Sequence, residues 1–141
     1  MFYEQRLDAP SSPEALREEY DEELASIVSS VGLEPSSAET GIDQDVLAAL
    51  LDGESPSISL ESASAIAALA SDQPDAETIE TEACEHLLLG MTTAVLDVEA
   101  LAVELQIDLD PTEIQQKIER RAPMTFDEFV HIQYAIAAQS P

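Results

Sequence analysis

The sequence predicts an all-α fold of about eight helices, arranged as two similar halves of four helices each. Three observations support this prediction. Apolar residues recur at spacings of three and four, helix-capping residues precede these periodic stretches, and no stretch alternates between apolar and polar residues as a half-buried strand does. Hydrophobic residues make up 45% of the chain and are periodic rather than scattered, which argues against disorder.

The first half begins with an N-terminal segment, residues 1–12, whose Phe2 and Tyr3 we expect to pack back onto the bundle. Ser12 and Pro13 predict an N-cap and the first position of a helix. Glycines supply the C-terminal stops of three helices, at Gly32, Gly41 and Gly53. The four helices predicted in this half cover residues 13–31, about 35–40, about 43–52 and about 60–70.

The second half follows a linker at residues 71–75. Two capping boxes, Asp110 with Glu113 and Thr125 with Glu128, each predict the start of a helix. The four helices predicted here cover residues about 76–95, 98–106, 111–121 and 126–138. We therefore expect a first helical unit over residues 13–73 and a second over residues 74–141, packed on the first as one compact domain.

The two predicted halves repeat one another at an offset of 66 or 67 residues. Leu47, Leu51 and Pro56 correspond to Ile114, Ile118 and Pro123, and Ser59, Glu61 and Ile66 correspond to Thr125, Asp127 and Ile132. Any two four-helix units with short loops also align in this way, so a true duplication and a coincidence of layout are both open at this point.

Residues 40–53, Thr-Gly-Ile-Asp-Gln-Asp-Val-Leu-Ala-Ala-Leu-Leu-Asp-Gly, resemble the turn and recognition helix of a phage-repressor-type helix-turn-helix. The resemblance covers about residues 13–70 and implies that the start of the recognition helix faces base edges and the residues after it hold phosphates. The matching positions are Asp43, Gln44, Asp45 and Ala48, then Asp52, Glu54 and Ser55. Because the carboxylates would repel phosphates, we interpret the unit over residues 13–73 as a degenerate helix-turn-helix without DNA contacts.

Three stretches of the chain resemble a family of small acidic haloarchaeal proteins known as a domain of unknown function. They are Met-Phe-Tyr-Glu-Gln-Arg at residues 1–6, Ala-Cys-Glu-His-Leu-Leu-Leu-Gly-Met-Thr-Thr at residues 83–93 and Gln-Gln-Lys-Ile-Glu-Arg-Arg-Ala-Pro-Met-Thr at residues 115–125. The resemblance implies a salt-rich cytoplasm and brings no activity with it.

Charge supports the same environment. The chain has 30 Asp and Glu against five Lys and Arg, a formal net charge of −25. Charge of this size destabilises a compact state by self-repulsion, but at molar salt the Debye length falls to about 3 Å and the repulsion is largely screened. We therefore expect a cytoplasmic protein of a halophilic archaeon.

We expect the purified protein to lose helical structure as salt is removed, because unscreened carboxylates repel one another. Far-ultraviolet circular dichroism in buffers from molar KCl to no salt measures this loss. A fully helical spectrum in dilute buffer would contradict the halophilic interpretation.

The basic residues are concentrated in one place. Lys117, Arg120 and Arg121 are three of the five, and they follow Gln115 and Gln116 on the helix predicted over residues 111–121. Such side chains suit base edges and phosphates, or an acidic partner. The competing interpretation is that cations near a helix C-terminus complement the helix dipole and that Glu113 and Lys117 form an i,i+4 pair.

No catalytic constellation is evident in the sequence, and we expect no enzyme activity, cofactor or metal. The chain lacks a Gly-rich phosphate loop, and no nucleophile has an evident base beside it. Glu82 and His86 share a helix face, but two ligands do not make a metal site. Cys84 is the lone cysteine, and no apolar run approaches the roughly 20 residues of a membrane span.

Two hypotheses for function follow. The first is a non-enzymatic regulatory or adaptor protein that acts through protein contacts, with an unknown partner or as a homodimer. The helix over 76–95 is apolar around much of its circumference at residues 87–89, so it is either the central helix of the bundle or a dimer contact. The second hypothesis is a DNA-binding transcriptional regulator that reads through the helix 111–121.

Overall fold

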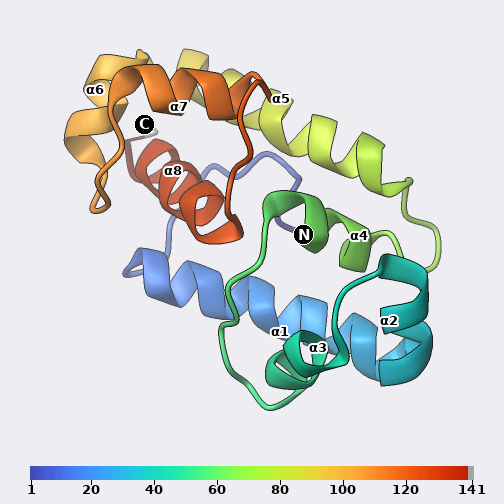
Figure 1. Ribbon diagram of the computed structural model, residues 1–141. Coiled ribbons are helices and arrows are strands. Elements are labelled where there is room, and N and C mark those ends of the chain that lie inside the picture. The colour runs from blue at the N-terminus through green and yellow to red at the C-terminus, as the bar shows by residue number, and fades with distance from the viewer. Residues whose placement is uncertain (140–141) are drawn as a thin grey trace.

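The computed structural model describes residues 1–139 and confirms the all-α prediction (Figure 1). Within these residues the chain forms eight helices and a single isolated β-bridge. The helices are α1 (Pro13–Val31), α2 (Leu33–Thr40), α3 (Gln44–Leu51), α4 (Leu60–Ala67), α5 (Ala76–Ala94), α6 (Val98–Glu104), α7 (Pro111–Ile118) and α8 (Phe126–Gln139).

The predicted helix starts are confirmed within one residue except for α2, which begins at Leu33, two residues before the predicted position. The starts that are confirmed have local signals. The Ser12 side chain accepts a hydrogen bond from the Ala15 amide at 3.1 Å. The capping box before α7 is complete, with the Glu113 amide 2.8 Å from Asp110 Oδ1. At the start of α8, the Glu128 amide donates to Thr125 Oγ1 and the Thr125 amide donates to Glu128 Oε1, each at 2.9 Å.

Three helix ends were predicted too late. After α4 the hydrogen-bond pattern changes, because the Leu69 and Ala70 amides bond to carbonyls three residues back rather than four. After α6, Leu105 is extended, with ψ 144°. The helix α7 ends at Ile118 rather than residue 121, because Arg120 adopts a left-handed backbone with φ 64°. This last correction moves Arg120 and Arg121 off the helix and into the following loop.

The helices lie in two layers with α4 and α8 between them (Figure 1). Helices α1, α2 and α3 form the lower layer in this view, and α5, α6 and α7 form the upper layer. Contacts cross between the two sequence halves, with α4 against α5 and α8, and α1 against α8. At Gly90 a Cβ would lie 2.8 Å from the Ile136 side chain, so glycine allows α5 to approach α8 closely.

The N-terminal segment is part of the core, as expected from Phe2 and Tyr3. The Phe2 side chain is 1% exposed. Its ring centroid lies 5.1 Å from that of Phe126, 5.5 Å from Tyr3 and 5.8 Å from Phe129 in edge-on arrangements. The Gln133 side chain, which accepts a hydrogen bond from the Tyr20 hydroxyl, donates to the Phe2 carbonyl at 3.0 Å.

The single bridge joins the loops that precede α4 and α8. Ser59 pairs with Thr125, the Leu60 amide bonds to the Met124 carbonyl at 2.9 Å, and the Phe126 amide bonds to the Ile58 carbonyl at 2.8 Å. Leu60 and Phe126 are 66 residues apart, and so are Ile58 and Met124. A shift of 66 residues, the offset of the predicted repeat, therefore relates one hydrogen bond to the other. This pairing follows the offset of the predicted repeat, and both duplication and a coincidence of layout account for it.

A buried ion pair ties α1 to the rest of the bundle. Arg17 and Asp21 lie one turn apart on α1, with 2.8 Å between Arg17 Nε and Asp21 Oδ1, and their side chains are 7% and 8% exposed. Arg17 also donates to the Pro56 carbonyl at 2.6 Å, and Ser55 donates to Asp21. The loop before α4 is thereby held against α1.

Candidate functional site

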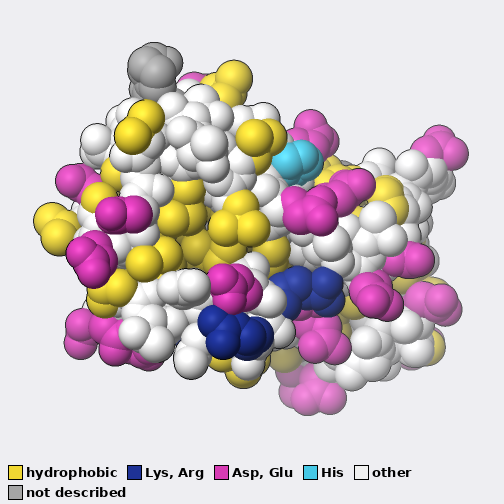
Figure 2. Space-filling model, turned by 90° about the horizontal axis from the view of Figure 1, so that it is seen from above, with side chains coloured by type: hydrophobic (Ala, Val, Ile, Leu, Met, Phe, Trp, Pro, Cys, Tyr) yellow, Lys and Arg dark blue, Asp and Glu magenta, His cyan; other side chains and the backbone are white. Residues whose placement is uncertain are grey.

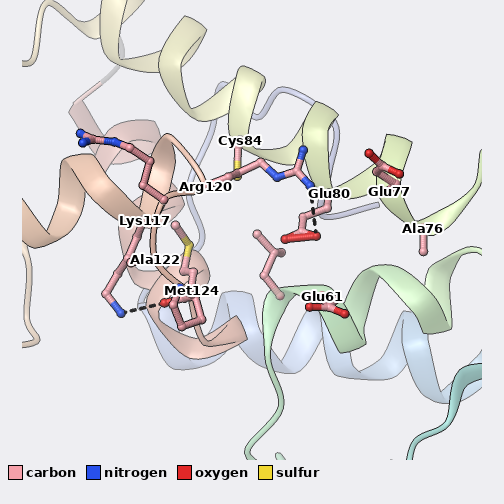
Figure 3. A pocket seen from close by; sticks show the side chains of 12 residues that line it. Glu61, Ala76, Glu77, Glu80, Cys84, Lys117, Arg120, Ala122 and Met124 are labelled. Atoms are coloured by element: carbon pink, nitrogen blue, oxygen red, sulfur yellow. Dashed lines mark hydrogen bonds and ion pairs between the residues drawn. The ribbon is translucent and has the colours of Figure 1, made fainter.

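The predicted basic site is divided between a helix and a loop. Gln115, Gln116 and Lys117 lie on α7, whereas Arg120 and Arg121 lie in the loop between α7 and α8. Figure 3 shows that the Lys117 and Arg120 side chains point in different directions, Lys117 toward the α7–α8 loop and Arg120 toward α5. The basic residues therefore do not form one continuous surface.

Lys117 connects α7 to the start of α8. Its Nζ atom lies 3.0 Å from the Pro123 carbonyl and 2.9 Å from Glu128 Oε1, and its side chain is 16% exposed. Glu128 also accepts the Thr125 amide, so one carboxylate caps α8 and binds the lysine. The Lys117 amine is therefore already bound by the α7–α8 loop and by the start of α8.

Arg120 reaches across to α5. It donates to the Thr81 hydroxyl, and its Nη2 atom lies 3.7 Å from Glu80 Oε2. Burial raises the pKa of Glu80 and outweighs the opposing effect of the Arg120 charge. Arg120 thus links the α7–α8 loop to α5, and its side chain is 37% exposed.

Arg121, the most exposed of the three basic side chains at 60%, pairs with Glu119. Its Nη2 and Nε atoms lie 2.6 and 2.9 Å from Glu119 Oε1, and Gln115 Nε2 donates to the other oxygen at 3.1 Å. Hydrogen bonds from Gln115 and Arg121 lower the pKa of Glu119. Gln116 is half-buried, and its carbonyl accepts the Arg121 amide at 2.8 Å.

The basic residues line a cleft of about 620 Å³ between α4, α5 and the α7–α8 loop. Three carboxylates also line it, from Glu61, Glu77 and Glu80. Its apolar lining includes Cys84, and burial raises the pKa of that thiol to about 11. Three cations and three carboxylates line the cleft, so it presents no field of one sign to a ligand.

The residues matched to the recognition helix are on the surface in the first half. Asp43, Gln44, Asp45, Asp52 and Glu54 are all exposed. Four of these five side chains are acidic, and phosphates would meet carboxylates at this end of the molecule.

The two histidines have structural neighbours. His86 Nδ1 lies 2.6 Å from the Tyr3 carbonyl and so fastens the N-terminal segment to α5. His131 is buried on α8, with Nε2 3.7 Å from Asp127 Oδ2. Within residues 1–139 no group of three or more His, Cys, Asp or Glu side chains is placed to hold a metal ion.

Four large apolar side chains on α5, at its C-terminal end and on α6 are exposed. We name this the α5–α6 surface and define it by Leu88, Leu89, Val95 and Val103, which are 47%, 48%, 88% and 82% exposed. Figure 2 views the molecule from the side of α5, α6 and α7; hydrophobic side chains are visible in the middle of this face, with Lys and Arg beside them and acidic side chains spread over the face and its edge. The sequence pointed to residues 87–89, and it counted Val95 among the apolar residues of the helix 76–95 without indicating that Val95 is exposed; it gave no signal for Val103.

Val95 combines two unfavourable features. It ends α5 in the left-handed region, with φ 57°, where glycine or asparagine is usual. Its amide and that of Leu96 bond to the Thr92 and Met91 carbonyls at 3.2 and 2.9 Å, which fixes this geometry. A β-branched residue in this conformation is strained, and such strain clusters at functional sites.

We expect Val95→Asn to raise the free energy of unfolding by about 1 kcal/mol, since asparagine adopts the left-handed conformation more readily. Urea denaturation in molar KCl at low protein concentration measures the change. Val103→Asn is the matched control, because Val103 is similarly exposed but lies within the helix α6, and there we expect less than about 0.5 kcal/mol. Equal effects at both positions would contradict strain at Val95.

Fold and composition together define a small, strongly acidic all-α protein. The model of a family of unknown function, DUF5791, matches residues 16–139, and the chain belongs to this family. No curated protein and no solved structure matches the chain. Among residues 1–139, no single helix has the length and apolar character needed to cross a membrane, and α5 and α6 meet that test only as a pair bent by 92°.

Proposed function

We propose that this protein is a non-enzymatic regulatory or adaptor protein that acts through protein–protein contacts in the cytoplasm of a halophilic archaeon. The observation that carries the proposal is the α5–α6 surface. Four of the seven large hydrophobic side chains exposed within residues 1–139 belong to it, on a molecule of net charge −25. An apolar centre with a charged rim is the usual composition of a protein interface.

The contacts of the basic residues support the same proposal. Lys117 is held by Glu128 and Pro123, Arg120 by Glu80 and Thr81, and Arg121 by Glu119. Contact with phosphate would have to replace these internal partners. Molar salt further weakens binding that depends on release of counterions.

The alternative is a DNA-binding regulator that reads through α7 and the loop after it. The exposure of Arg121 and Gln115 favours it, since both side chains are on the surface, where they bond to the same residue, Glu119. In this alternative, Gln115 and Gln116 read base edges while Lys117, Arg120 and Arg121 hold phosphates.

Crosslinking and recovery of the tagged full chain from a halophilic host at native salt separates the two proposals. We expect one reproducible partner protein, no DNA enrichment, and loss of the partner in Leu88→Asp/Leu89→Asp. Leu51→Asp is the control, because Leu51 is 40% exposed but lies on α3.

The outcome that favours DNA is equally specific. Discrete DNA peaks that disappear in Arg120→Ala/Arg121→Ala and persist in Arg120→Lys/Arg121→Lys would overturn the adaptor proposal and establish the alternative.

A further inference from the structure

We propose that the α5–α6 surface is the interface of a homodimer, in which a second copy of this chain covers Leu88, Leu89, Val95 and Val103 by twofold symmetry. The inference rests on the proposed function, because it takes the same surface as a site of protein contact. It adds the identity of the partner.

The exposed face of α5 is less polar than its sequence suggests. The Thr92 hydroxyl donates to the Leu88 carbonyl at 3.2 Å, and the Thr93 hydroxyl donates to the Leu89 carbonyl at 3.0 Å. Both hydroxyls therefore have partners within the helix. The two threonines are exposed beside Leu88 and Leu89, so a partner could cover this face without leaving their donors unsatisfied.

Charge favours a second copy as the partner. Residues 86–96 carry no Asp, Glu, Lys or Arg, although the chain has 30 acidic residues among 141. Two copies, each of net charge −25, repel one another least where neither presents carboxylates. A second copy always offers the same neutral surface, and twofold symmetry makes such a surface its own complement.

Val95 supplies an independent reason for a partner. It is strained at φ 57° and is 88% exposed, so in an isolated chain the strain is not offset by burial of the side chain. Burial of its side chain against a second copy would give the apolar residue a role that asparagine or glycine could not fill.

The size of the molecule is compatible with this interface. A standard interface covers roughly 800 Å² on each partner. The accessible surface of the chain is 7152 Å², so such an interface takes about one ninth of it.

The rim makes dimerisation depend on salt. Glu85, Asp97 and Glu99 are exposed at the two ends of the neutral stretch. A twofold axis through this surface brings carboxylates of both copies to the edge of the interface, where they repel. Salt screens this repulsion, so the dimer is expected to be tighter in molar KCl than at low salt.

The test is sedimentation equilibrium of the full chain in molar KCl. We expect a mass of twice 15.2 kDa at micromolar concentrations. Leu88→Asp/Leu89→Asp should weaken the dimer at least a hundredfold, because it places buried carboxylates at the centre of the interface. Val103→Asp, on α6, should weaken it as well. Leu51→Asp, which adds an equivalent charge on α3, should leave it unchanged.

Circular dichroism and urea denaturation of each variant show that a loss of dimer is not a loss of fold. A monomeric wild-type chain in molar KCl would overturn the homodimer. A dimer that persists in both the α5 and the α6 variants would overturn the assignment to this surface.

The crosslinking experiment distinguishes failure of the inference from failure of the proposed function. A monomer that still retains a different protein, lost in Leu88→Asp/Leu89→Asp, leaves the adaptor function and removes the dimer. A dimer disrupted by these variants, with DNA peaks that depend on Arg120 and Arg121, leaves the dimer and removes the adaptor.

Discussion

Replacing Arg17 with Met is expected to lower the free energy of unfolding by about 3–5 kcal/mol, because it removes one partner of a buried ion pair. The Arg17 side chain is 7% exposed, and its Nε atom lies 2.8 Å from Asp21 Oδ1. Its guanidinium carbon lies 5.1 Å from the centre of the Phe126 ring. Without the guanidinium, the Asp21 carboxylate stays buried and keeps the hydrogen bond from the Ser55 hydroxyl, but it has lost its cation.

Urea denaturation in molar KCl measures this effect, since guanidinium salts would themselves change the ionic strength. Arg121→Met is the matched control, because Arg121 is 60% exposed and its pair with Glu119 is screened by solvent, so we expect a much smaller loss. The double variant Arg17→Met/Asp21→Leu should recover much of the loss, since it replaces both buried charges by apolar groups. A similar loss in Arg17→Met and in Arg121→Met would contradict a special role for the buried pair.

Replacing Phe2 with Ala is expected to lower the free energy of unfolding by about 3–5 kcal/mol, because it leaves a cavity among aromatic side chains. Phe2 is 1% exposed and its ring contacts those of Phe126 and Phe129, although it lies only one residue from the N-terminus. The Gln133 side chain holds the Phe2 carbonyl at 3.0 Å, so the backbone of this segment is fixed as well.

Thermal and urea denaturation in molar KCl measure the loss. Leu7→Ala is the control within the same segment, because Leu7 is 63% exposed and its truncation should cost less than about 0.5 kcal/mol. If Phe2→Ala and Leu7→Ala gave the same small change, the N-terminal segment would not be part of the core that determines stability.

The predicted basic site shows which features of a site can be predicted from the sequence and which depend on the fold. Its residues are adjacent in the chain, and adjacency suggested one contact surface on a helix. In the structure α7 ends at Ile118, Lys117 turns to Glu128, and Arg120 reaches Glu80 on α5. Those carboxylates come from other elements of the fold, so no local pattern could have revealed the pairs.

The sequence by itself determined the helices and their starts, because these depend on residues a few positions apart. Ser12, Asp110 and Thr125 cap helices through hydrogen bonds that span three residues. The net charge of −25 also follows from the sequence alone. It belongs to the composition and does not depend on how the chain folds.

Only the tertiary structure decided which side chains are buried in pairs and which stay exposed. Arg17 is held by the Pro56 carbonyl, 39 residues away, and Phe2 by Gln133, 131 residues away. Val95 and Arg120, at the C-terminal ends of α5 and α7, adopt a left-handed conformation in which glycine is the usual residue. The physical reason is that burial, pairing and backbone strain depend on neighbours brought together by folding, whereas helix propensity and capping act between residues that are already close in the chain.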